Sequence, residues 1–407
     1  MRQTKLLAPT GLTYFLIIAL LVQFTISSCS SKNENIVKVE FGNPVDNFIE
    51  LIDSVEIIPL ETDSLHILGF KKRLFIENDK YIVVNMDVFN SCLIPQNGSN
   101  KNEDISSLDS YYLHSHIYSY DLSGNFIEEI GRRGDGIGEY NDILSAQIYD
   151  HNLIVYSTPD KFSDHDKELC YDLQGGVDEK ILMEEINGDA YKTKDGVLSY
   201  IGFGTNLPYR LTLIEEGGET KNFLFGKENR KVYSVSGLYP NFSSDGDDIF
   251  LIDSYNSTIF KYRKKEVTEY LNFDFGKYKI PQKFFKFDDP NQAFLYLQSI
   301  EAAGISFFSK EGETFLVGFY GYTNFARFDY ALYHNNKWTF FHLEKESKEM
   351  AFLQNFMTIH NGFLYYLVPA EAVINMPDSL VKLTVNIETR ERLKSGDNYV
   401  VAKIKLK

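Results

Sequence analysis

The sequence predicts an all-β protein whose short sheets repeat around a ring, a six-bladed β-propeller. Runs of alternating apolar and polar residues recur along the chain, and long helical periods are scarce. Aromatic residues make up 15% of the chain, with 32 Phe and 27 Tyr, and flat rings pack well on a pleated sheet. A strand–turn–strand unit that ends in Asp-Leu-x-Gly also returns along the sequence.

Composition indicates a folded protein with a large core and no affinity for nucleic acid. The chain has 407 residues, of which 43% are hydrophobic. Its formal charge of −16 repels phosphate backbones. Three cysteines, Cys29, Cys92 and Cys170, lack CxxC spacing, so no disulfide framework is indicated. Cys92 and Cys170 could pair only if the fold brings them together.

Residues 1–28 are expected to be a targeting segment rather than part of the fold. Arg2 and Lys5 form a basic start, and an apolar run follows over residues 11–24. This run is shorter than the roughly 20 apolar residues that a membrane-spanning helix needs. The pattern therefore predicts a signal peptide.

The end of this segment, Ile26-Ser27-Ser28-Cys29, resembles the lipobox of bacterial lipoproteins. The resemblance implies that Cys29 is acylated and becomes the mature N-terminus. Residues 29–35 would then be the lipidated cysteine and a polar tether, and the propeller would occupy residues 36–407. Several acyl chains on one cysteine would hold the protein firmly on a membrane. An ordinary signal peptide with an incidental cysteine is the alternative.

Strand-like runs continue from the tether to the last residue. A polar stretch near 95–110 is poor in β-formers and predicts an exposed insertion, and a short helix is plausible within 281–302. Six units of three or four strands then take roughly 60 residues each. The predicted strands lie within 36–41, 55–61, 74–76, 81–84, 116–120, 146–149, 153–156, 168–172, 191–225, 248–253, 257–262, 267–275, 304–308, 314–319, 327–332, 362–368 and 399–407.

The stretch Tyr118–Tyr140 shows how one unit leads to the next. Its two strands flank a turn at 122–125, and a glycine-rich corner follows at 131–140; the same turn pattern returns at Leu169–Gly176. The corner matches neither GxGxxG nor GxxxxGK[ST], so we interpret its glycines as geometric rather than phosphate-binding.

Radial repetition lets such short sheets bury both faces and protect their edges. A stack of β-sandwiches is the rival architecture, but it does not explain the recurring order of strands and turns. For closure of the ring, the C-terminal strand 401–406 and the N-terminal strand 36–41 are expected to share one blade.

Several segments together resemble the six-bladed β-propeller lipoproteins of Bacteroidetes, which are related to NHL-type propellers. They are Ile57–Thr62, Tyr120–Tyr140, Ile259–Pro281 and Asp397–Lys407. Ile137 and Tyr399 depart from the family, which usually has Pro there. The resemblance implies a propeller fold and a binding or structural role, often near glycan-utilisation systems.

No residues in the sequence form a recognisable catalytic, cofactor or metal set. There is no GxSxG or HExxH, and the acidic groups lack the EF-hand order of alternating acids, glycine and a distal Glu. His114 and His116 would share a strand face, but no third zinc ligand stands nearby. The acidic groups, which we interpret as solvated turns, are Asp160, Asp164 and Asp166, and Asp245, Asp247 and Asp248.

The best candidate for ligand binding is the tyrosine-rich segment near residue 320. In an extended chain Tyr320, Tyr322 and Asn324 share one face, and Arg327 follows. Exposed tyrosines beside amides suit sugar rings, which stack on aromatic faces and form hydrogen bonds at their rims. A blade core with its loop is the alternative interpretation.

These observations favour a lipid-anchored module of the bacterial envelope, at the outer membrane, that binds a glycan, a peptide or an envelope protein and is not an enzyme. One alternative is a propeller enzyme, a glycoside hydrolase or lyase with carboxylates around its channel. Another is a structural subunit of an uptake complex.

Overall fold

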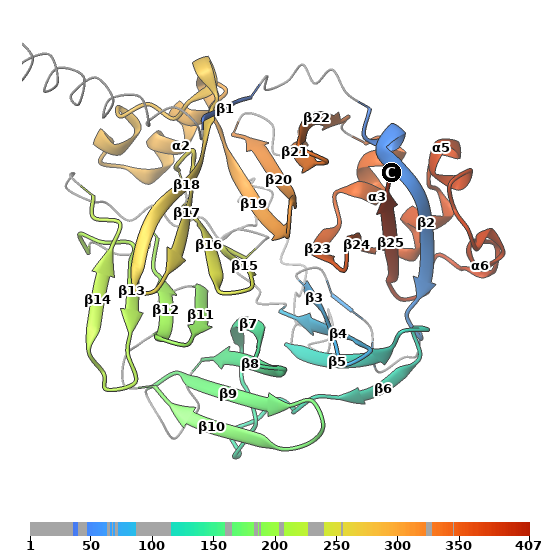
Figure 1. The fold of residues 1–407 in the computed structure, drawn as a ribbon, viewed down its shortest axis with the longest axis horizontal. Coiled ribbons are helices and arrows are strands. Elements are labelled where there is room, and N and C mark those ends of the chain that lie inside the picture. Colours follow the sequence, from blue (N-terminus) through green and yellow to red (C-terminus); the bar gives the residue numbers. More distant parts are fainter. Residues whose placement is uncertain are drawn as a thin grey trace, which may run out of the picture.

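The computed structural model is a six-bladed β-propeller, in agreement with the sequence, and Figure 1 shows its sheets around a central axis. The predicted signal peptide with Cys29, the insertion near 95–110, and Cys92 lie outside the described residues. The structure describes residues 36–39, 47–62, 66, 68–69, 72–86, 115–158, 165–182, 186, 189–202, 207–226, 240–253, 255–322, 328–344 and 346–407.

Each blade is an antiparallel sheet whose strands follow one another outward from the axis. Blade 1 holds β3 (Lys72–Glu77), β4 (Lys80–Asn85), β5 (His116–Asp121) and β6 (Phe126–Glu129); blade 2 holds β7 (Ile143–Tyr149), β8 (Asn152–Ser157), β9 (Lys167–Asp172) and β10 (Val177–Ile181). Blade 3 holds β11 (Asp189–Thr193), β12 (Gly196–Tyr200), β13 (Leu211–Ile214) and β14 (Thr220–Phe223).

The second half of the ring repeats this plan. Blade 4 holds β15 (Phe242–Asp245), β16 (Asp248–Ile252), β17 (Thr258–Arg263) and β18 (Glu266–Asp274); blade 5 holds β19 (Ala303–Glu311), β20 (Thr314–Gly321), β21 (Phe328–His334) and β22 (Lys337–Leu343). Blade 6 holds β23 (Phe356–His360), β24 (Phe363–Val368), β25 (Val400–Leu406) and β2 (Ile52–Pro59).

Two-residue turns fix the register of several hairpins. Both central residues have positive φ in these turns, as a type I′ turn requires, and its twist matches that of the flanking strands. Asn and Asp tolerate this conformation better than most residues. The pairs are Asn78-Asp79, Asp150-His151, Lys264-Lys265, Asn335-Asn336 and Asn361-Gly362.

The ring closes in blade 6, where β25 lies between β24 and the N-terminal strand β2 (Figure 1). Our expectation that residues 36–41 would complete this blade was wrong. Ile36–Lys38 form β1, which instead adds a fifth strand to blade 4, parallel to β18. The eight-residue β2 buries Ile52, Val55 and Ile57 and so offers a longer apolar face than the three-residue β1.

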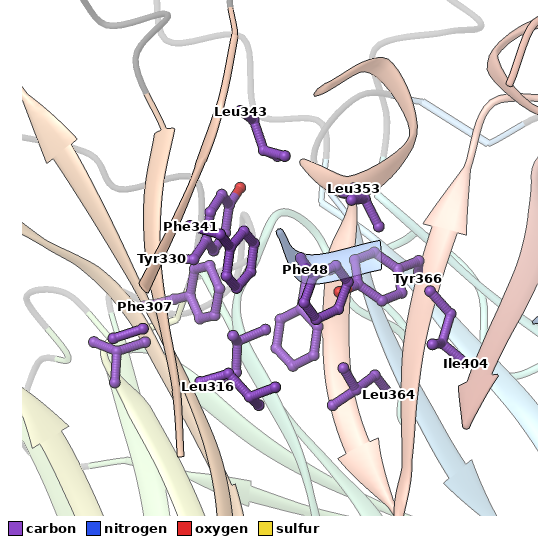
Figure 2. Packing of buried hydrophobic residues seen from close by; sticks show 14 of the residues in the cluster. Phe48, Phe307, Leu316, Tyr330, Phe341, Leu343, Leu353, Leu364, Tyr366 and Ile404 are labelled. Carbon is purple, nitrogen blue, oxygen red and sulfur yellow. The ribbon is translucent and has the colours of Figure 1, made fainter. Parts of the chain in front are cut away.

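Between β1 and β2 the chain packs on blade 5 through a 3₁₀ turn, η1 (Phe48–Leu51). The Asn47 side chain caps this turn by accepting the Ile49 N–H at 3.1 Å. Phe48 is 3% exposed, and its ring stacks on Phe341 with centroids 4.5 Å apart. Figure 2 shows Phe48 within the hydrophobic cluster. The N-terminal segment thus touches three consecutive blades.

The predicted helix within 281–302 is present as α2 (Pro290–Ser299), with Pro at its first turn and Asp289 as its N-cap. It follows two 3₁₀ turns, η5 (Gly276–Tyr278) and η6 (Phe284–Lys286). Four more helices were not predicted, because each has only one or two turns: α3 (Lys348–Leu353), α4 (Ala370–Ile374), α5 (Asp378–Val381) and α6 (Ile387–Arg392). No described helix is long and apolar enough to cross a membrane.

The stretch Tyr118–Tyr140 joins blade 1 to blade 2, and its glycines serve geometry as we interpreted them. Gly124 has φ +89°, and a Cβ there would lie 2.0 Å from the Pro59 carbonyl oxygen of β2. Gly138 has φ +72°, and a Cβ there would lie 2.5 Å from Val177 Cγ1. Glycine alone fits both positions without strain.

If closure by β25 holds the ring, removing apolar volume there should destabilise the whole propeller. Ile404 is fully buried between β24 and β2. We expect Ile404→Ala to lower the free energy of unfolding by about 3 kcal/mol. Denaturant unfolding measures the effect, with Lys405→Ala on the exposed face as the control. Equal effects of the two substitutions would contradict this account.

Candidate functional site: the central channel

The innermost strands of the six blades, β3, β7, β11, β15, β19 and β23, line a cavity of about 540 Å³. Aromatic rings and polar side chains share its wall, among them Tyr191, Phe356 and Tyr399 with Gln147, Ser309 and Thr358. A concave site that mixes rings with a few polar groups is the usual setting for a small ligand. The channel is therefore the candidate site.

One wall of the channel is held by a polar chain that crosses four blades. Arg73 on β3 reaches Asp189 on β11, with Nη2 and Oδ1 3.2 Å apart, and donates to the Ala146 carbonyl oxygen at 2.9 Å. Ser145 donates to the same Asp189 Oδ1 at 2.5 Å. The Asn241 N–H, just before β15, donates to Asp189 Oδ2 at 2.7 Å. Both oxygens of Asp189 are thus occupied.

A second set of contacts joins blades 2 and 3 behind this wall. The Gln147 side-chain amide donates to the Lys192 carbonyl at 3.0 Å and accepts the Lys192 N–H at 2.7 Å. It thus forms the two hydrogen bonds that the backbone of a neighbouring strand would form. Lys192 Nζ lies 2.7 Å from Glu168 Oε1, and Tyr156 donates to Glu168 Oε2 at 3.0 Å. Burial, reinforced by Glu168, raises the pKa of Tyr156 well above its usual value.

The remaining charged groups of the channel also have partners. Lys72 lies over the Tyr399 ring, 3.5 Å from its centroid, and donates to the Gly69 carbonyl at 3.0 Å. Lys310 pairs with Asp245. Glu77 pairs with His151 at 2.8 Å, and this contact raises the pKa of the exposed imidazole. The hydrogen-bonding groups left to a ligand are therefore mostly neutral.

The structure places the predicted ligand residues elsewhere, beneath α2. The Tyr320 and Tyr322 hydroxyls are hydrogen-bonded to each other at 2.6 Å, and Tyr322 is only 1% exposed. The expectation of an exposed Tyr322 was wrong, because residues 276–302 cover this end of blade 5. Burial raises the pKa of Tyr320 to about 12, although the hydrogen bond with Tyr322 lowers this pKa in part. Asn324 and Arg327 lie outside the described residues.

The acidic groups and histidines considered for metals have other partners where they are described. Asp166 accepts the Ile186 N–H at 2.7 Å, and Asp248 lies 3.3 Å from Arg263 Nε. His116 Nδ1 lies 2.8 Å from Glu129 Oε1. His114, Asp160 and Asp164 are not among the described residues. Within the described ranges no group of three or more His, Cys, Asp or Glu side chains is arranged to hold a metal ion.

Sequence reasoning missed the channel residues because they are far apart along the chain. Arg73 and Asp189 are 116 positions apart, and neither belongs to a motif. The useful signal was the repeat itself, since the first strand of each unit lines the axis of a propeller. Polar residues in those strands, such as Arg73, Gln147 and Asp189, could have been singled out on that ground.

Residues 90–405 match a protein family described as a domain of unknown function, DUF4934. The chain belongs to this family. No curated protein matches its sequence.

Among solved structures, one from Bacteroides fragilis NCTC 9343, titled a "putative exported protein", has a TM-score of 0.68 at 14% identity and covers 91% of this chain and 99% of its own. The β-propeller domain of the Trilobed protease from Pyrococcus furiosus has a TM-score of 0.33 at 12% identity, covering 73% and 77% of the two chains. At 14% identity the likeness to the Bacteroides fragilis structure concerns the fold alone.

Removing one partner of the Arg73–Asp189 pair should leave the other charge uncompensated. Both side chains are largely buried, at 14% and 9% exposure. We expect Asp189→Ala to lower the free energy of unfolding by about 3 kcal/mol. Asp247→Ala, which removes an exposed pair with Lys194, should cost less than about 1 kcal/mol. Comparable losses in denaturant unfolding would show that the polar chain does not stabilise the ring.

Proposed function

We propose that the chain is an exported, lipid-anchored binding module that takes a neutral, hydroxyl-rich ligand, such as a glycan, in its central channel. The observation that carries the proposal is a cavity of about 540 Å³ in which the charged side chains already have partners. Arg73, Asp189, Lys310 and Glu77 each belong to an ion pair, and Lys72 contacts the Tyr399 ring and a backbone carbonyl. A charged ligand would have to break these pairs, whereas a neutral one would not. The pairing therefore favours a neutral ligand.

The groups that remain on the channel wall suit a sugar. Ser309 and Thr358 supply hydroxyls. The half-buried Tyr191 and Tyr399 supply aromatic side chains, whereas Phe356 is buried against Phe307. Sugar rings stack on aromatic faces and form hydrogen bonds with hydroxyls and amides. The resemblance to propeller lipoproteins near glycan-utilisation systems points the same way, and a peptide of neutral side chains is the nearest alternative.

Binding without catalysis is favoured by the state of the carboxylates. A glycoside hydrolase needs one carboxyl group as acid and a second as base or nucleophile. In the channel, Asp189 already accepts hydrogen bonds at both oxygens, and Glu77 is held by His151. Neither is placed to exchange protons with a substrate, so this arrangement supports a binding protein.

The cell envelope is the location that fits this role. The sequence of residues 1–28 resembles a lipoprotein signal peptide, and the structural relative from Bacteroides fragilis carries a description as exported. We place the chain on the outer membrane, held by acyl chains on Cys29.

Filling the channel should weaken ligand binding. We expect Thr358→Trp, on β23, to weaken binding to a panel of neutral oligosaccharides by at least roughly tenfold, because the new ring takes up cavity volume. Thr220→Trp, on the outermost strand of blade 3, is the matched control and should bind as the native chain does. Glycan-array binding followed by calorimetry measures the difference. Unchanged binding by Thr358→Trp, or turnover of a glycan, would overturn the proposal.

Anchoring at Cys29 can be tested independently of the ligand. We expect Cys29→Ala to move the protein from the membrane fraction to the soluble fraction, because acyl chains cannot be attached. Labelling with a radioactive fatty acid should be lost in the same variant, and Cys170→Ala should keep both properties. Membrane fractionation that is unaffected by Cys29→Ala would refute the anchor.

A further inference from the structure

The first part of the segment that follows blade 4 is rich in lysine within an acidic protein. Residues 276–286 contain four lysines and no Asp or Glu, although the chain has 57 acidic and 41 basic residues. All four ammonium groups, on Lys277, Lys279, Lys283 and Lys286, are exposed. None has a carboxylate of the described chain within ion-pair distance. We call these four residues the lysine surface.

Apolar and aromatic side chains accompany these charges. Lys283 Nζ lies 4.8 Å from the centroid of the Tyr296 ring, and Lys277 Nζ lies 4.8 Å from that of Tyr278. Leu295, on the outward side of α2, is 64% exposed. Lysines beside aromatic rings and an exposed leucine are typical of surfaces that rest at a membrane interface.

The strand that follows the predicted tether, β1, lies beside β18, which leads into the lysine surface. Ile36, the first described residue, pairs with Asn272 on β18, four positions before Gly276 (Figure 1). Cys29 is seven residues before Ile36, and seven extended residues span at most about 25 Å. A lipid on Cys29 would therefore hold blade 4 and the lysine surface close to the bilayer.

From this charge and this placement we propose that the lysine surface docks on the anionic headgroups of the bilayer that holds the lipid anchor. The proposal rests on the proposed lipidation of Cys29. Each lysine near an anionic membrane surface adds attraction, and the tether removes most of the cost of bringing the two together. Blade 4 then faces the membrane, and the opposite side of the ring points away from it.

The test uses the native lipidated chain reconstituted into neutral phosphatidylcholine vesicles and into vesicles that also contain phosphatidylglycerol. Acetylation of each lysine is followed by mass spectrometry. We expect the lysine surface to react about tenfold more slowly on the anionic vesicles at low salt. The difference should vanish at high salt, which screens the attraction. Exposed lysines elsewhere should react equally on both vesicles: Lys180, Lys348, Lys382 and Lys394.

Charge reversal provides the second measurement. Lys38, exposed on β1 beside β18, should also be protected from acetylation when the native chain is on anionic vesicles. In a variant with Glu at all four positions of the lysine surface, Lys38 should lose this protection. A matched variant with Glu at Lys180, Lys348, Lys382 and Lys394 has the same net charge as the first variant. In this matched variant Lys38 should stay protected. All eight positions are exposed, so both variants should have the same melting temperature as the native chain.

Three outcomes would overturn the proposal. Equal labelling on both vesicles, with the chain bound to each, refutes the lysine surface but leaves the anchor intact. A chain that floats with neither vesicle refutes both the anchor and the surface. Protection that appears only when envelope proteins are added assigns the surface to an acidic protein rather than to lipid.

Discussion

The pairing of β25 with β2 is the contact on which the rest of the structure depends. β25 forms antiparallel ladders with β24 on one side and with β2 on the other, and its apolar side chains are buried between them. Lys407 N–H also donates to the Leu51 carbonyl at 2.9 Å. Without this pairing blade 6 would lack its outer strand, and β25 would be left as an open sheet edge.

Within the closed ring, polar contacts rather than apolar ones set how the inner strands of blades 1 to 4 meet. Arg73, Ser145 and Asp189 bond to one another across blades 1, 2 and 3, and Asn241 extends the chain to blade 4. Buried ion pairs contribute little net stability because their desolvation is costly. Their directionality is more useful here, because it fixes the spacing of the inner strands and leaves Arg73 and Asp189 with partners in the protein.

The repeat made the fold predictable, because each unit carries its own strands and turns. Tyr118–Tyr140 was read correctly as a blade end and a step to the next blade. The sequence could not show that β2, rather than β1, completes blade 6. Both segments have alternating apolar and polar residues, and only packing decides which of them pairs with β25. Tyr322 was wrongly predicted to be exposed, because the alternation of residues along a strand does not show that residues 276–302 fold over it. The channel contacts join residues far apart in sequence, such as Arg73 and Asp189, and these have no local signature.

The position of β2 has a consequence for the time at which the protein can fold. Asp53 and Lys405, which form an ion pair across β2 and β25, are 352 residues apart in the sequence. A contact of such long range carries a large loop-closure entropy and forms late. Blades 1 to 5 can assemble as the chain emerges, but the ring can close only after β25 has emerged as well. Blade 6 is therefore expected to be the last blade to become protected from proteases.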